Sequence, residues 1–345
     1  MRLLVLGGTS YLSLHIARHA LTRGHDVTCA ARGESGPAPD GARFLALDRD
    51  EPGALDPLIG ARFDAVVDVA TGALGWVLEA LEALADRTRH WTFVSSINVY
   101  SDTASPGQTV HAPLHEPVTS TRRYDPFAAE TTIEIHGGLK VAGENAVRAR
   151  LGDDHSLLVR PGIISGPGDV MDRFGYWAGR FARGGRAVVP DSPRQPVQHI
   201  DVRDLAAWIV TAAEDDLTGT FDAIGPGVEL GEVFEPTARL VGAPDLELVP
   251  VAPEVLTGAG VAHWGGPASL PLWLPESMHG LVTHDPVPAR DAGLVLRALG
   301  DTIRTALADE RARGLDRPRR AGLTPEQERA VLDAADIEAG RSGPG

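Results

Sequence analysis

The sequence predicts an α/β protein with a doubly wound parallel sheet and a smaller C-terminal lobe. Through the first half, short apolar runs alternate with helix-like segments, as expected for parallel strands buried on both faces. The first run ends in Gly7-Gly8, a turn typical of phosphate-binding strand–turn–helix units. Past Gly166 the chain becomes rich in Gly, Pro and aromatic residues with shorter elements, which indicates the second lobe.

The elements follow the same alternation in order. Strands are expected at residues 2–6, 27–31, 42–47, 63–69, 90–95, 156–160 and 247–251. Helices are expected from the glycine turn to Arg23, at 74–84 with leucines at helical spacing, at 126–150 and at 201–213. Residues 101–125 are rich in Pro, Ser, Thr and His, and their length is typical of a binding loop or lid.

These elements predict three parts. The sheet domain covers residues 1–162, including the 101–125 insertion, and residues 196–215 return to it. The smaller lobe covers residues 163–322, and residues 323–345 form a C-terminal helix and tail. Thr324, Pro325 and Gln327 predict a capping box at the start of that helix, and a frayed end is expected beyond Arg341.

Composition narrows the functional classes. The 345 residues carry a formal charge of −15, which argues against a nucleic-acid-binding surface. A single cysteine, Cys29, lies in a predicted buried strand and fits a reducing compartment. No apolar run approaches the roughly 20 residues of a membrane span, and no leader precedes the first strand. We therefore expect a soluble cytoplasmic protein. Lys140 is its only lysine.

The end of the second strand bears on the cofactor. Folds that prefer NAD place an acid there to bind the ribose 2′-hydroxyl. The residues here are Ala30, Ala31 and Arg32, and an arginine suits a 2′-phosphate. This favours NADP(H) over NAD(H), with a solvated surface arginine as the alternative. Ser10 and Ser13 occupy positions where a glycine-rich fingerprint has glycines.

Six motifs occur in the order found in extended short-chain dehydrogenase/reductases. They are Gly7-Gly8-Thr9, Asp48-Arg49, Val69-Ala70, Val94-Ser95-Ser96 with Val99-Tyr100, Arg160-Pro161-Gly162, and His199-Ile200-Asp201-Val202-Arg203-Asp204. Over about residues 1–310 the chain resembles the NAD(P)-dependent epimerase/dehydratase-like reductases of that group. The resemblance implies a Rossmann-type domain, a substrate-binding C-terminal lobe, a small-molecule substrate and a homodimer formed through the helices that carry the lysine motif.

The resemblance also implies cofactor contacts at matching positions. Gly7, Ser10 and Leu12 would face the pyrophosphate, with Thr9 and Tyr11 in the same turn. Arg32 would bind the 2′-phosphate, and Asp48, followed by Arg49, would bind the adenine. Ala70 and Lys140 would meet the nicotinamide ribose, and Pro161, Gly162 and Ile163 would pack by the nicotinamide amide.

The reaction centre departs from the family pattern. The family uses Tyr-x-x-x-Lys on one helix, where the spacing puts both side chains on one face, and a serine after the fifth strand. This chain keeps Lys140 and Ser96 but has His136 in place of the tyrosine. The predicted catalytic set is therefore Ser96, His136 and Lys140.

Three interpretations of the substitution remain open. In the first, His136 is the general acid/base, held neutral by Lys140 and a positive nicotinamide. In the second, a phenol comes from elsewhere, namely Tyr100, Tyr124 or Tyr176. In the third, carbonyl reduction is lost, and the site performs redox-neutral chemistry or only binds.

Other candidates lie in the insertion and the lobe. Arg173 can pair with an anionic substrate group, and Tyr176 and Trp177 can form an apolar wall, unless these aromatics are lobe core. With Tyr100 and Tyr124 they complete the candidate substrate contacts. His111, His115 and Glu116 match no zinc spacing, so no metal is expected. Asp201 and Asp204 are interpreted as structural.

The predicted function is NADP(H)-dependent oxidoreduction of a small carbonyl or alcohol metabolite, typical of secondary metabolism. Ser96 would polarise the oxygen and His136 would transfer the proton. Two alternatives stay open: a redox-neutral epimerase, dehydratase or cyclase, and a non-catalytic nucleotide-sensing or partner-binding protein.

Overall fold

A computed structural model describes residues 1–125, 128 and 131–341, and the chain divides into two compact units. The first comprises Met1–Ile163, Val202–Gly225 and His284–Leu296. The second comprises Ile164–Asp201, Pro226–Thr283 and Arg297–Gly345. The return to the first unit thus covers Val202–Gly225 rather than 196–215, the sequence did not anticipate the His284–Leu296 segment, and the C-terminal helix belongs to the second unit.

The first unit is built on a seven-stranded sheet of order β11-β6-β5-β4-β1-β2-β3, in which every pairing is parallel. The strands are β1 (Arg2–Leu6), β2 (Asp26–Ala31), β3 (Arg43–Ala46), β4 (Phe63–Asp68), β5 (Thr88–Val94), β6 (Ser156–Pro161) and β11 (Gly219–Ala223). Six of them match predicted strands. The sequence analysis did not predict β11.

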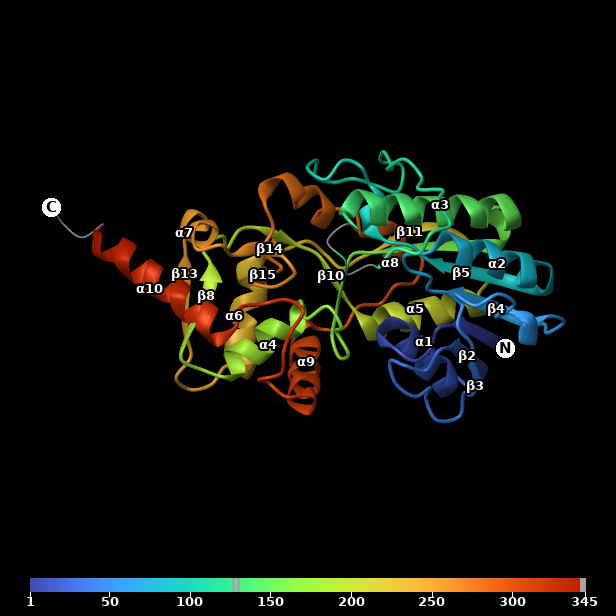
Figure 1. Ribbon diagram of the computed structural model, residues 1–345, viewed down its shortest axis with the longest axis horizontal. Helices are drawn as coiled ribbons and strands as arrows, with labels where there is room; N and C mark the ends of the chain where they lie inside the picture. The colour runs from blue at the N-terminus through green and yellow to red at the C-terminus, as the bar shows by residue number, and fades with distance from the viewer. Residues whose placement is uncertain (126–127, 129–130, 342–345) are drawn as a thin grey trace. The chain divides into compact units, whose positions relative to one another are not determined.

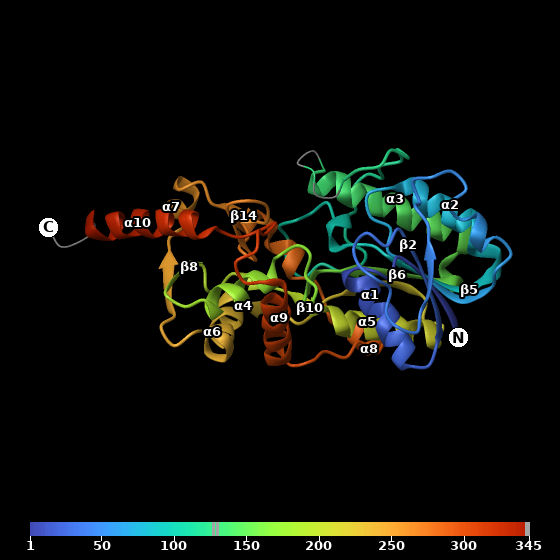
Figure 2. The same ribbon diagram turned by 60° about the horizontal axis from the view of Figure 1, so that its bottom comes forward.

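Helices cover both faces of this sheet, as predicted for a doubly wound fold (Figures 1 and 2). Helices α1 (Tyr11–Thr22) and α5 (Val202–Glu214) pack together on one face, and α2 (Leu74–Leu84) and α3 (Ile133–Leu151) on the other. The short α8 (Val287–Asp291) packs near β11. The expected start of the α3 helix at Pro126 lies outside the described residues. A Rossmann-type sheet is therefore confirmed.

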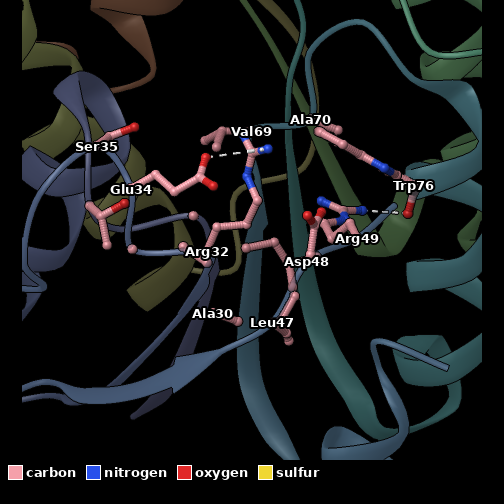
Figure 3. A pocket seen from close by; sticks show the side chains of 15 residues that line it. Ala30, Arg32, Glu34, Ser35, Leu47, Asp48, Arg49, Val69, Ala70 and Trp76 are labelled. Atoms are coloured by element: carbon pink, nitrogen blue, oxygen red, sulfur yellow. Dashed lines mark hydrogen bonds and ion pairs between the residues drawn. The ribbon is translucent and has the colours of Figure 1, made fainter. Parts of the chain in front are cut away.

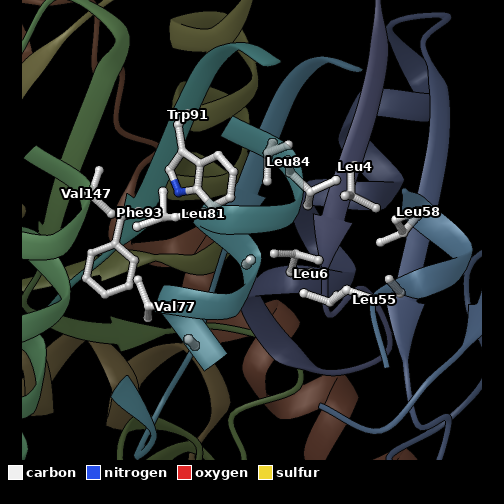
Figure 4. Close-up of a cluster of buried hydrophobic side chains, with 14 of the residues drawn as sticks. Leu4, Leu6, Leu55, Leu58, Val77, Leu81, Leu84, Trp91, Phe93 and Val147 are labelled. Atoms are coloured by element: carbon white, nitrogen blue, oxygen red, sulfur yellow. The ribbon is translucent and has the colours of Figure 1, made fainter. Parts of the chain in front are cut away.

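The strand sequences explain why both faces are buried. Leu3, Leu4 and Val5 of β1 are all completely buried, and alternate side chains point to opposite faces. Leu4 and Leu6 join a core with Leu81 and Leu84 of α2 and with Trp91 of β5 (Figure 4). Val77, Ala80, Leu81 and Leu84 recur at helical spacing and supply this layer, whereas Leu78 is 43% exposed.

The second unit combines short strand pairs with helices. The pairs are β7 (Ile163–Ser165) with β10 (His199–Asp201), β8 (Arg186–Pro190) with β13 (Glu247–Val251), β9 (Pro196–Val197) with β12 (Val228–Glu229), and β14 (Ala262–Trp264) with β15 (Ser269–Pro271). The helices are α4 (Phe174–Ala182), α6 (Leu230–Val241), α7 (Pro253–Gly258), α9 (Leu299–Arg313) and α10 (Pro325–Arg341).

Helix α10 begins as predicted and is anchored to its unit. Thr324 and Gln327 exchange the two capping-box hydrogen bonds, at 2.9 and 3.2 Å. Glu328 forms a buried ion pair of 2.7 Å with Arg180 of α4. None of the helices in the described part of the chain combines the length and apolar character that a membrane span requires.

Candidate functional site

The turn after β1 has the shape that a phosphate-binding turn needs. Gly7 and Gly8 have φ angles of 135° and 100°, a region that favours glycine. A Cβ atom on Gly8 would lie 2.4 Å from the sulfur of Cys29, and one on Gly7 would lie 3.0 Å from Val69. The backbone here therefore has to be bare. Cys29 is a completely buried core residue, and this burial raises the pKa of its thiol to about 11.

The two serines that replace glycines are accommodated in this turn. Ser10 is the extended N-cap residue of α1, and its side chain makes no capping hydrogen bond. The Ser13 hydroxyl donates to the Ser10 carbonyl at 2.7 Å, so the second serine ties the turn to the helix. The first N–H groups of a helix lack intrahelical partners and attract anions. The substitutions therefore leave a helix N-terminus of the kind that binds a pyrophosphate.

A cavity of about 170 Å³ opens at the carboxyl ends of β1 to β4 (Figure 3). Of the predicted cofactor residues, it is lined by Gly7, Thr9, Arg32, Asp48, Arg49 and Ala70. Ser10, Tyr11, Leu12, Lys140, Pro161, Gly162 and Ile163 are not among its lining residues. The lining also includes side chains that the sequence analysis missed, notably Glu34, Ser35 and Trp76. The cavity thus brings together residues predicted for the pyrophosphate, the 2′-phosphate and the adenine, but not those predicted for the nicotinamide amide.

Glu34 is the most consequential of the missed residues. Its carboxylate lies 3.4 Å from the Arg32 guanidinium (Figure 3). Both side chains are substantially exposed. The sequence prediction considered an acid only at the last residues of β2, where there is none. The acid stands two residues past Arg32, beyond Gly33. A search for acidic residues that extended three residues past the end of β2 would have identified Glu34.

The Arg49 guanidinium is held by hydrogen bonds within the protein. It donates to both carboxylate oxygens of the fully buried Asp68, at 2.8 and 3.3 Å, and to the carbonyl of Trp76. Its guanidinium also lies 5.5 Å from the centre of the Trp76 ring. Arg49 is therefore a fixed part of the cavity wall.

Lys140 occupies a buried position between two strand ends. Its ammonium donates to the carbonyls of Ala70, after β4, and of Val94, in β5, at 2.6 and 2.7 Å. Burial lowers the pKa of Lys140 to about 8, against the raising effect of Asp68 and Glu144. An ammonium has three hydrogens, so one remains after these two bonds.

Ser96 and His136 are each linked to this lysine, Ser96 through the strand end that the lysine binds and His136 through their common helix. Ser96 follows Val94 by two residues, is partly buried, and accepts a 3.1 Å hydrogen bond from the backbone of Asn98. His136 is partly buried and lies one turn before Lys140 in α3, whose N-cap is Thr132. All three predicted catalytic residues therefore belong to the same end of the sheet.

Tyr100 is not available as the missing phenol. Its ring is completely buried, and its hydroxyl donates to Asp222 at 2.6 Å and accepts from Arg160 at 2.8 Å. Burial and the Asp222 carboxylate raise the pKa of this phenol. The predicted substrate contact at Tyr100 is therefore not supported, because the ring belongs to a buried network.

This network extends further in both directions. Arg160 donates to both oxygens of Glu144, at 2.8 and 2.6 Å, and His284 lies 3.0 Å from Asp222. Ser95 donates to Glu144 at 2.6 Å. These groups join α3, β5, β6 and β11 at one end of the sheet. Their partners lie far apart in the sequence, so no local pattern could have revealed them.

The end of the insertion, interpreted from the sequence as a binding loop or lid, lies near Trp76 of the cavity wall. The backbone of Tyr124 donates to the carbonyl of Gly72 at 2.7 Å, and its ring lies 4.3 Å from the Arg122 guanidinium. Arg123 stands 5.5 Å from the centre of the Trp76 ring. Tyr124 is partly exposed, so it remains a candidate for a substrate contact.

Glycines in α3 let the turn after β5 and the insertion approach the helix. A Cβ atom on Gly137 would lie 2.1 Å from the carbonyl of Asn98, and one on Gly138 would lie 2.6 Å from the carbonyl of Glu116. The backbone of Val118 donates to Gly138 at 2.9 Å. The residue directly after His136 is thus part of a close backbone contact.

The remaining predicted contacts belong to the second unit. Tyr176 and Trp177 are almost fully buried; the Tyr176 hydroxyl accepts from Leu323 at 3.4 Å, and the Trp177 indole donates to Pro271 at 2.7 Å. Trp177 packs 4.3 Å from Phe234. The two aromatics are therefore lobe core, and Tyr176 is not an available phenol. The Arg173 guanidinium lies 4.2 Å from the centre of the Trp264 ring.

The acidic side chains make structural contacts rather than a metal site. Asp201 accepts from Thr302 at 2.7 Å and lies 3.6 Å from Arg297, in keeping with a structural role. Within the described ranges, no group of three or more His, Cys, Asp or Glu side chains is arranged to hold a metal ion.

The fold and the site together define a class: an α/β protein with a bare glycine turn before its first helix and a buried lysine at the carboxyl ends of its strands. A model of the NAD dependent epimerase/dehydratase family matches residues 3–222. The chain belongs to this family of enzymes.

Two relatives are oxidoreductases by name. A 2'-dehydrokanamycin reductase of Streptomyces kanamyceticus is 31% identical over 200 residues, 55% of this chain and 52% of the reductase. The chain thus matches about half the length of that relative. A dTDP-6-deoxy-L-talose 4-dehydrogenase (NAD(P)(+)) of Kitasatospora kifunensis is 30% identical over 241 residues, 65% of this chain and 68% of the relative.

Solved structures confirm the fold. WbmG of Bordetella bronchiseptica, in complex with NAD and UDP, superposes with a TM-score of 0.65 at 17% identity, covering 91% of this chain and 96% of that one. The UDP-glucose 4-epimerase of Thermus thermophilus, in complex with NAD, gives a TM-score of 0.61 at 16% identity, covering 90% of this chain and 99% of that one. At these identities the likeness concerns the fold alone.

Proposed function

We propose that this enzyme is an NADP(H)-dependent oxidoreductase that acts on a carbonyl or alcohol of a small sugar-like metabolite, with His136 in the place of the family's tyrosine. The observation that carries the cofactor assignment is that Arg32 and the glycine turn line the same cavity. The names of the two oxidoreductase relatives support the reaction class and a sugar-like substrate.

The residues present fit a dinucleotide. Bare backbone at Gly7 and Gly8 permits close approach of a pyrophosphate, and the N-terminus of α1 favours its charge. The Arg32 guanidinium is a suitable partner for a 2′-phosphate. When bound, the nicotinamide supplies or accepts the hydride at the substrate carbon.

Residues of the chain itself orient the substrate oxygen and transfer the proton. The hydroxyl of Ser96 donates to the substrate oxygen and orients it. His136 transfers a proton to that oxygen in reduction and removes it in oxidation, which balances the hydride. The remaining hydrogen of the Lys140 ammonium binds a ribose hydroxyl, while the carbonyls of Ala70 and Val94 hold the nitrogen in place.

The first experiment measures cofactor binding and net redox change. We expect the purified protein to bind NADP(H) more tightly than NAD(H) in calorimetric titrations. With 2′-dehydrokanamycin and NADPH, or dTDP-6-deoxy-L-talose and NADP⁺, nicotinamide absorbance should change in proportion to product. The absence of NADP(H) binding would refute the cofactor assignment.

The role of His136 is tested with two substitutions. His136→Ala should reduce kcat by about 100-fold or more, the usual worth of a general acid/base, with cofactor affinity retained. His136→Tyr restores the family's residue and should retain more activity than His136→Ala. Unchanged turnover in His136→Ala would exclude proton transfer by this residue.

A redox-neutral epimerase or dehydratase is the second candidate, favoured by the family model that matches residues 3–222. In that case the substrate is converted while nicotinamide absorbance returns to its starting value. Product analysis together with absorbance separates the two functions. The homodimer implied by the resemblance is likewise a proposal, and sedimentation equilibrium would test it.

A further inference from the structure

A buried carboxylate is bound to two residues of the cavity wall. Asp68, the last residue of β4, is completely buried, and its Oδ1 atom accepts two hydrogen bonds. One comes from Nη1 of Arg49 at 2.8 Å, and the other comes from the backbone N–H of Ala70 at 2.9 Å. Since Arg49 and Ala70 both line the cavity, one carboxylate oxygen connects two parts of its wall (Figure 3).

Ala70 also connects this carboxylate to Lys140. The N–H of Ala70 donates to Asp68, and its carbonyl oxygen accepts from the Lys140 ammonium at 2.6 Å. A bond between an Asp side chain and the N–H two residues later is typical of turns, and here it sets the direction of the chain as it leaves β4. The position of the Ala70 carbonyl therefore depends on Asp68.

The ammonium is sensitive to the position of that carbonyl. Val94 in β5 supplies the second acceptor at 2.7 Å, and the centre of the Phe93 ring lies 5.2 Å from the lysine Nζ. An ammonium has three hydrogens in tetrahedral directions, so two carbonyls that fix two of them also fix the third. A shift of Ala70 would therefore redirect the remaining hydrogen of Lys140.

Two buried ion pairs supply the charge around this lysine. Burial lowers the pKa of Lys140 to about 8, while the Asp68 and Glu144 carboxylates act in the opposite direction. The charged side chains that act on Lys140 or pair with those that do are Asp68 with Arg49, and Glu144 with Arg160 and Arg148. His136 lies one turn earlier in α3. Of these arginines, Arg49 lines the cavity, so the Asp68 pair is the one that reaches it.

We propose that Asp68 is the positioning residue of Lys140, and that it couples the ammonium to a dinucleotide held in the cavity, through Arg49 on one side and the Ala70 peptide on the other. All four residues belong to the first unit. The inference rests on the proposed function in taking NADP(H) as the ligand. It goes beyond that function, because a ligand at the adenine end then acts on the lysine without touching it.

The chain itself supplies the readout. Lys140 is its only lysine, so protein grown with ¹³C-lysine gives one Cε signal that needs no assignment. The titration of this signal reports the pKa of the ammonium, and its position at fixed pH reports the surroundings of the side chain. The ligand probe is adenosine 2′,5′-bisphosphate, which carries the adenine, the ribose and the 2′-phosphate of NADP(H) but no nicotinamide.

Asp68→Asn removes the charge and keeps an oxygen that can accept from Ala70 and Arg49. The pKa of Lys140 should fall by about 1 or more, the size expected for the loss of an adjacent carboxylate, whereas the probe should still move the Cε signal. The matched control is Glu328→Gln, which breaks a buried ion pair of the second unit and should leave both readouts unchanged. An unchanged titration in Asp68→Asn would overturn the proposal.

A second variant removes the connection itself. A buried guanidinium without its counter-ion destabilises a protein, so Arg49→Leu and Asp68→Leu are introduced together and replace the pair by apolar groups. With the bond to the Ala70 N–H removed, the probe should bind but no longer move the Cε signal. A response equal to the native one would show that the ligand acts on the lysine directly, which contradicts the coupling.

The outcomes distinguish this inference from the proposed function. If calorimetry shows that NADP(H) and the probe bind while the native Cε signal does not move, the cofactor assignment stands and the coupling fails. If neither ligand binds, the cofactor assignment fails and the coupling to NADP(H) fails with it. The titration of the ligand-free Asp68→Asn protein then still decides whether Asp68 acts on the lysine.

Discussion

Replacing Arg32 with glutamine tests the cofactor preference directly. The Arg32–Glu34 pair is exposed, with nitrogen and oxygen 3.4 Å apart. Coulomb attraction at that distance is about 1 kcal/mol in water, and exposed pairs typically measure about 0.2–1 kcal/mol. A 2′-phosphate can therefore displace Glu34 at small cost.

The binding free energy gained from an Arg32–phosphate contact is larger than the free energy lost when the Arg32–Glu34 pair is broken. A hydrogen bond to a charged group contributes about 1.5–3 kcal/mol, so the net advantage after displacing Glu34 is about 1–2 kcal/mol. Arg32→Gln should therefore weaken NADP(H) binding by about 5- to 30-fold and change NAD(H) binding by less than about twofold. Calorimetric titration with both cofactors, at two salt concentrations, provides the measurement.

Glu34→Gln is the companion change. It removes the competing carboxylate, so NADP(H) should bind about two- to fivefold more tightly, the range expected for an exposed ion pair. NAD(H) should bind no better, because the carboxylate is the group that can accept from a ribose 2′-hydroxyl. If Arg32→Gln weakens both cofactors equally, or if Glu34→Gln weakens NADP(H), Arg32 is not the 2′-phosphate residue.

Three further outcomes are expected. Tyr100→Phe should lower the free energy of unfolding by about 1–3 kcal/mol, because its two buried partners each lose a hydrogen bond; a denaturation midpoint equal to the native one would contradict this. Gly137→Ala should cost about 1–3 kcal/mol, because the new Cβ would lie 2.1 Å from a backbone carbonyl, whereas Gly258→Ala, with open space around it, should cost nothing measurable in the same thermal melts. The folded-state pKa of Lys140, about 8, lies below its ordinary value of 10.5, so between these pH values the unfolded chain binds more protons and native stability rises with pH. Lys140→Met lacks this contribution, and parallel stability profiles for the two proteins across that window would count against the buried, partly deprotonated lysine.

The sheet and its covering helices were predictable because their signals are local. Helix α2 ends where its leucine spacing ends, and β13 coincides with its predicted range. The Gly7-Gly8 turn was recognisable for the same reason, since positive φ angles and bare backbone restrict the residue type. Strand β11 escaped prediction because Gly219, Thr220 and Asp222 interrupt its apolar character.

The site was only partly predictable, because its decisive contacts join distant segments. Glu34 lines the cavity from the turn that follows β2, whereas the sequence analysis considered only the last residues of the strand. Tyr100 resembled a substrate residue in its motif, yet its role depends on Asp222, 122 residues away. Tyr176 and Trp177 are aromatic residues beyond a strand end, and only the packing of their helix reveals that they are core.

The contact between Gly8 and Cys29 gives the protein a built-in reporter. Cys29 is the chain's single thiol, it is completely buried, and its sulfur lies against the Gly7-Gly8 turn. A thiol reagent can modify it only when that turn or its strand opens, so the labelling rate measures the opening equilibrium at one defined point. Since a ligand held by the turn stabilises the closed state, protection of one cysteine would follow cofactor occupancy without any introduced label.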